Sequence, residues 1–81
     1  MNEYAKELGE VLKTFDTAKL REFILEHWDM YRILTSPELI ANDKWLKGAM
    51  AKMILARTDM PEDLKEEAKK VLDEMGWDYE I

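Results

Sequence analysis

The chain opens with apolar residues at helical spacing. Over residues 3–15 one narrow apolar stripe predicts an amphipathic helix: Tyr4, Leu8, Val11, Leu12 and Phe15. Asp16 and Thr17 follow, and the side chain of either residue can accept a hydrogen bond from the free N–H groups that open a helix. We therefore expect the first helix to end here and a second to begin.

Residues 17–34 predict a second helix with a broader apolar face. At 100° per residue, an arc of roughly 160° holds most of its apolar side chains: Leu20, Phe23, Ile24, His27, Trp28, Met30, Tyr31 and Leu34. This width indicates contact with two neighbouring elements, and it places Met30 in the core. Leu25 and Ile33 fall outside the arc, where we expect them either to pack on the next short segment or to form an exposed apolar patch.

Two start signals bound the next apolar segment. In the first, Ser36-Pro37, the serine can cap a helix, and proline suits the first helical position because it lacks an N–H. The second, Asn42-Asp43, leaves two alternatives: one continuous helix to residue 57, or a short turn followed by a new helix over 44–57. We favour the break, because Asn and Asp side chains compete with the helical backbone for hydrogen bonds.

The segment 44–57 is apolar over about half of its circumference, which is typical of a central helix. Gly48 and Ala51 are small and would let another backbone approach this helix closely. Its three lysines alternatively suggest a basic amphipathic helix of the kind that binds membrane surfaces, but the apolar face is needed to fill the core.

The last helix follows a break at Thr58–Pro61. Its apolar stripe consists of Leu64, Ala68, Val71, Leu72 and Met75. Gly76 is the expected end, because glycine tolerates the positive φ that often terminates helices, and Trp77 should then lie back against the last turn, near Leu72. The tail 77–81 alternates apolar and acidic residues, which predicts an extended segment that packs on the helices or on a partner.

Together these elements predict an all-α protein: a small antiparallel bundle of four to five short helices with an extended C-terminal tail. Because the chain has only 81 residues, we expect residues 1–81 to form a single domain. A hydrophobic content of 47% excludes a disordered chain. No apolar run approaches the ~18 residues that span a bilayer, and no signal peptide opens the chain, so we expect a cytoplasmic protein without membrane contact.

The net charge of −6 is confined to the C-terminal end. Acidic and basic residues balance over residues 1–58, whereas residues 59–81 carry nine acidic residues and three basic ones. An acidic end repels the phosphates of nucleic acid and attracts basic protein surfaces. Nucleic acid is therefore an unlikely partner, and a basic protein surface a favoured one.

Residues suited to catalysis or metal binding are scarce. The chain has no cysteine and one histidine, His27, which we interpret as a structural residue hydrogen-bonded to a carbonyl or an acid rather than as a pH-linked switch or a ligand contact. The carboxylate pairs Glu22/Glu26, Glu62/Glu66 and Asp63/Glu67 each share a helix face but lack the calcium-loop pattern. We predict no enzymatic activity, no cofactor and no metal.

The sequence is therefore best interpreted as a protein–protein interaction module that binds another protein or a second copy of itself. The predicted partner-binding residues are Leu25, Ile33, Glu62, Asp63, Glu66, Glu67, Asp73, Glu74, Trp77, Tyr79 and Ile81. One alternative is an acidic inhibitor from a phage or plasmid that occupies the basic surface of a nucleic-acid-binding or defence protein. A second is a nucleic-acid-binding regulator that uses Lys44, Lys47, Lys52 and Arg57.

Overall fold

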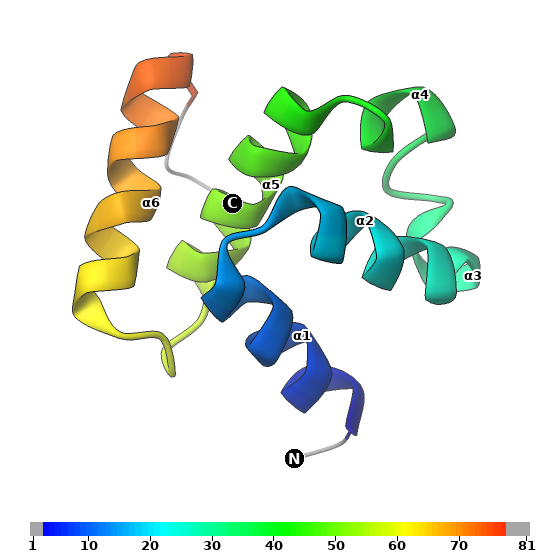
Figure 1. Cartoon of the computed structure of the whole chain (residues 1–81), viewed down its shortest axis with the longest axis horizontal. Coiled ribbons are helices and arrows are strands. Elements are labelled where there is room, and N and C mark those ends of the chain that lie inside the picture. The colour runs from blue at the N-terminus through cyan, green and yellow to red at the C-terminus, as the bar shows by residue number, and fades with distance from the viewer. Residues whose placement is uncertain (1–2, 78–81) are drawn as a thin grey trace.

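The computed structural model describes residues 3–77. These residues form six α-helices, and no strand occurs in that range (Figure 1). The helices are α1 (Glu3–Thr14), α2 (Thr17–Glu26), α3 (Trp28–Tyr31), α4 (Pro37–Ile40), α5 (Asp43–Ala56) and α6 (Glu62–Met75). The predicted all-α class is confirmed. Six helices replace the expected four or five because two segments of the chain are broken into shorter pieces.

The long helix α5 lies at the centre of the fold, as predicted. It contacts α1, α2, α4 and α6, and it runs antiparallel to α6 (Figure 1). Its side chains Leu46, Met50 and Ile54 are completely buried. The other large side chains that are fully buried come from the helices around it: Leu12, Leu20, Ile24 and Leu72. The core is thus built around one helix whose apolar residues face several neighbours.

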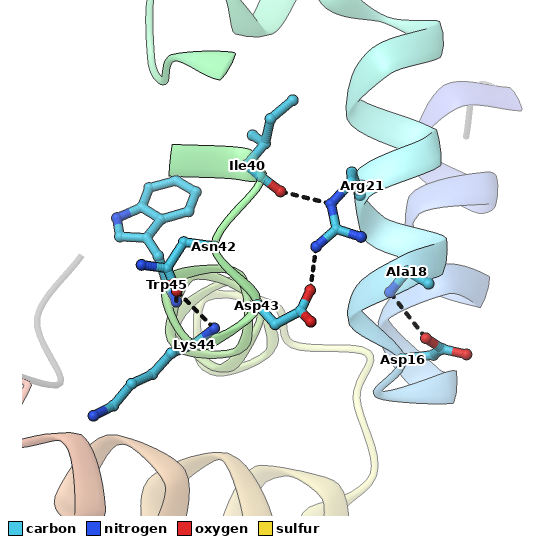
Figure 2. Close-up of polar contacts among 8 residues, drawn as sticks. All are labelled: Asp16, Ala18, Arg21, Ile40, Asn42, Asp43, Lys44 and Trp45. Carbon is cyan, nitrogen blue, oxygen red and sulfur yellow. Dashed lines mark hydrogen bonds and ion pairs between the residues drawn. The ribbon is translucent and has the colours of Figure 1, made fainter. Parts of the chain in front are cut away.

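The junction between α1 and α2 lies where the capping residues predict it. Asp16 is the capping residue, and its Oδ1 accepts a hydrogen bond from the backbone N–H of Ala18 at 2.9 Å (Figure 2). Phe15 has a φ of 52°, in the left-handed region that residues other than glycine rarely adopt. Its ring packs against the core, which offsets the strain of this sharp turn.

The expected continuous helix over residues 17–34 is wrong. Helix α2 ends at Glu26, and His27 has a φ of −115° and a ψ of 35°, outside helical geometry. The chain then makes the single turn α3, and residues after His27 lose their phase with α2. As a consequence Met30 and Leu34, both expected on the buried arc, have exposed side chains.

The predicted break at Asn42-Asp43 is confirmed. Helix α4 is one short turn, capped by Ser36, whose Oγ accepts from the backbone N–H of Leu39 at 3.3 Å. Asn42 then caps α5, since its Oδ1 accepts from the backbone N–H of Lys44 at 3.0 Å and of Trp45 at 3.2 Å (Figure 2). Helix α5 begins one residue earlier than expected because the cap is Asn42 and Asp43 is its first residue.

Helix α6 ends at Gly76, as predicted, with a φ of 71°. The backbone N–H of Trp77 donates to the carbonyl of Leu72 at 2.9 Å, which places the indole back over the helices. A Cβ at Gly48 would lie 2.6 Å from a carbon of that ring. The small residue expected to admit another backbone therefore admits a side chain, the half-buried indole of Trp77.

Candidate interaction surface

Within residues 3–77, five large apolar side chains remain exposed, and all of them lie between residues 25 and 39. They are Leu25, Met30, Ile33, Leu34 and Leu39, here called the 25–39 surface. Ile33 is 81% exposed and Leu34 is 72% exposed. Single exposed apolar residues are ordinary on protein surfaces, but a concentration of this kind is typical of a binding site. The elements that carry it lie at the end of the molecule far from α6 (Figure 1).

The short helix α3 is anchored to α1 through its buried side, and its opposite side is exposed to solvent. Tyr31 is buried, and its hydroxyl shares a hydrogen bond with that of Tyr4 in α1. Burial raises the pKa of Tyr31 above its ordinary value, and the hydrogen bond to Tyr4 adds to this effect. The backbone N–H of Leu34 donates to the carbonyl of Tyr31 at 2.8 Å, so the following turn is also fixed while Ile33 and Leu34 point outward.

Helix α4 is fixed to α2 by the side chain of Arg21. Its Nε donates to the carbonyl oxygen of Ile40 at 2.7 Å, and its Nη2 forms an ion pair with the carboxylate of Asp43 (Figure 2). This bridge satisfies a carbonyl at the end of α4 and joins it to the start of α5. The backbone that follows the 25–39 surface is thereby attached to α2 and α5.

His27 takes part in an aromatic cluster with residues of α1 and α2. Its ring centroid lies 4.4 Å from that of Phe23 and 5.0 Å from that of Tyr4. Its Nδ1 lies 3.0 Å from the carbonyl oxygen of Phe23, the kind of contact expected for a structural histidine. Within residues 3–77, no three side chains of the metal-ligating kind converge on one point.

A groove lies between α1 and α2. It has a volume of about 440 Å³ and is lined by Glu7, Glu10, Val11, Lys19, Glu22, Phe23 and Glu26. The residues from each helix are three and four positions apart, so each helix contributes one face. A second hollow is lined by residues 25–30, and Glu26 belongs to both. We call the first hollow the α1–α2 groove.

The structure separates the predicted partner-binding residues into two groups. Leu25 and Ile33 belong to the 25–39 surface, whereas six acidic residues lie on exposed positions of α6, at the other end of the molecule: Glu62, Asp63, Glu66, Glu67, Asp73 and Glu74. At 100° per residue these carboxylates fall within roughly 140° of the helix circumference, with Lys70 between them and Lys65 and Lys69 at one border. They form one acidic strip that a single lysine interrupts.

The aromatic residue predicted to bind a partner, Trp77, lies on α5. Its ring covers Gly48, and the Nζ of Lys52 lies 5.8 Å from the ring centroid. Tyr79 and Ile81 lie outside the described residues, as does the predicted extended tail. Among the basic residues suggested for nucleic-acid binding, Arg57 also has partners within the fold: its guanidinium donates to both carboxylate oxygens of Asp59 at 2.9 Å.

Sequence reasoning missed part of this surface. Met30 and Leu34 were assigned to the core because a break at His27 leaves no strong signal in the sequence. Leu39 was assigned no function. The carboxylates Glu7 and Glu10 become notable only when α1 packs beside α2, which periodicity does not reveal. The pair Glu22/Glu26 was the one available signal for the groove.

The chain matches no protein-family model, and neither a curated protein nor a solved structure similar to it was found. None of the helices in residues 3–77 has both the length and the apolar character needed to cross a membrane.

Proposed function

We propose that this protein is a small interaction module that binds another protein through the 25–39 surface. The observation that carries the proposal is the exposure of five large apolar side chains on one short stretch whose backbone is anchored to the core. Removing apolar area from water stabilises a complex by about 25 cal/mol per Å² before the costs of association are counted. A surface already ordered before binding lowers those costs.

The proposed role is binding without catalysis, and we place it in the cytoplasm. The single histidine packs in an aromatic cluster, and its Nδ1 lies within hydrogen-bond distance of a backbone carbonyl. These contacts support a structural role for it. The chain has no cysteine, whereas small secreted domains commonly depend on disulfides. These features support the proposal, and its test is the capture of a partner.

The test compares the wild-type chain with the double variant Ile33→Ser/Leu34→Ser in pull-downs from the host. Both side chains are largely exposed, so we expect the variant to fold with an unchanged melting temperature. The proposal predicts a captured protein that is lost with this variant. It also predicts that the variant Glu66→Gln/Glu67→Gln on α6 retains the protein. Equal capture by wild type and Ile33→Ser/Leu34→Ser would contradict the proposal, and light scattering of the chain alone shows whether the partner is a second copy.

A second candidate function is inhibition of a nucleic-acid-binding protein, with carboxylates standing in for phosphates. It is favoured by the six exposed acidic residues of α6 that share one arc. Lys70 within the arc reduces the density of negative charge and weighs against it. In the pull-down, this candidate predicts the reverse result: capture lost with Glu66→Gln/Glu67→Gln and retained with Ile33→Ser/Leu34→Ser.

A further inference from the structure

The α1–α2 groove combines an apolar floor with acidic walls. Val11 of α1 and Phe23 of α2 supply the floor. Glu7 and Glu10 stand on one wall, and Glu22 and Glu26 stand on the other. A hollow of about 440 Å³ admits at least one bulky apolar side chain together with the aliphatic stems of its neighbours.

The carboxylates around this groove have no ion-pair partner in the described part of the chain. Four carboxylates and one ammonium group, that of Lys19, line it. Within residues 3–77 none of the four carboxylates forms an ion pair, although the chain does pair Arg21 with Asp43 and Arg57 with Asp59. The four carboxylates outnumber the single ammonium group of the groove, so a cationic ligand would be attracted to it.

The groove is continuous with the 25–39 surface. Glu26 lines both the groove and the hollow formed by residues 25–30, which includes the exposed side chains of Leu25 and Met30. A helix or extended segment that enters the groove would therefore pass onto apolar surface beside it. The same partner segment can bury apolar side chains and meet carboxylates.

We infer that the α1–α2 groove binds a basic amphipathic segment of the partner protein, with a large apolar side chain on the floor and lysine or arginine residues against its walls. This inference rests on the proposed function, because it names the chemistry of the same partner. A second copy of the chain fits less well, since its net charge of −6 would face an acidic groove.

The test uses fluorescence anisotropy with the full chain and a fluorescein-labelled helical peptide of leucine and lysine. A peptide in which every lysine is replaced by glutamine serves as the uncharged control. We expect the lysine peptide to bind and its dissociation constant to rise with salt. The variant Glu10→Gln/Glu22→Gln/Glu26→Gln should weaken binding about ten-fold, because three exposed ion pairs are lost.

The matched control Glu62→Gln/Glu66→Gln/Glu67→Gln removes the same charge from α6 and should change the dissociation constant less than about two-fold, since the groove is unaltered. Equal weakening by both triple variants would show attraction by net charge alone and overturn the inference. Binding of the glutamine peptide as tight as that of the lysine peptide would also overturn it. So would a dimer of the chain alone that the groove variant dissociates.

The two proposals fail in different ways. If only the groove inference is wrong, the triple groove variant still captures the host partner, and Ile33→Ser/Leu34→Ser does not. If the 25–39 surface is not a binding site, capture is unaffected by Ile33→Ser/Leu34→Ser, whatever the peptide does.

Discussion

The α5–α6 pair and the 25–39 surface use apolar residues in opposite ways. In the pair, each helix has 14 residues, and Leu46, Met50, Ile54 and Leu72 have no exposed area. Between residues 25 and 39 the chain passes from the end of α2 through the single turns α3 and α4, and five apolar side chains face outward. Long helices can bury a whole stripe, whereas single turns anchor one or two residues and expose the rest.

The largest effect should come from a matched pair of isoleucines, one in each region. Ile54→Ala deletes a fully buried side chain and is expected to cost about 2–5 kcal/mol of unfolding free energy, since it leaves a cavity. Ile33→Ala deletes the same atoms from an 81% exposed side chain and should change the free energy by less than about 0.5 kcal/mol. Urea unfolding measures both. A large cost for Ile33→Ala would contradict the assignment of this residue to the surface.

A smaller effect should come from filling the space that Gly48 leaves for Trp77. A Cβ at residue 48 would lie 2.6 Å from the indole, so Gly48→Ala should cost about 1–3 kcal/mol through overpacking. In the Trp77→Ala background the same change should be neutral, or stabilising by up to about 1 kcal/mol, because alanine favours the helix more than glycine does. A double-mutant cycle by thermal unfolding measures the coupling. Equal effects of Gly48→Ala in both backgrounds would mean that the ring does not pack there.

The smallest effect is confined to alkaline pH and concerns the anchor of α3. Folding raises the pKa of Tyr31 above its ordinary value of 10.0, because burial disfavours the charged phenolate. The stability that this shift contributes is fully present below about pH 10 and is lost as the pH rises above that value. We expect the melting temperature of wild type to fall more steeply above pH 10 than that of Tyr31→Phe. Parallel pH profiles for the two proteins would refute this origin of the effect.

The contrast between the two regions also marks what the sequence could predict. The caps Asp16, Ser36 and Asn42 and the end at Gly76 were predictable, because short side chains that accept hydrogen bonds and glycine at positive φ act locally. The break at His27 was not, because it depends on how Tyr4 and Phe23 pack around that ring. Helix ends that depend on neighbouring residues can be predicted from the sequence, whereas tertiary packing overrides local helix preference at positions such as His27.

The candidate site was predictable only in part, for the same reason. Leu25 and Ile33 were identified because an unbroken helix already places them among charged residues. Met30 and Leu34 become exposed through the loss of helical phase after His27. The groove carboxylates Glu7 and Glu10 come from a different helix than Glu22 and Glu26, so only the packing of α1 on α2 brings them together.

The most direct test of the central claim is the footprint of the captured partner on this chain, measured by amide hydrogen exchange with and without the partner. Binding through the 25–39 surface predicts slower exchange for amides of residues 25–39 and of the α1–α2 groove, with little change along α6. Protection confined to Glu62–Met75, with residues 25–39 exchanging as in the free protein, would contradict it and favour the inhibitor function instead.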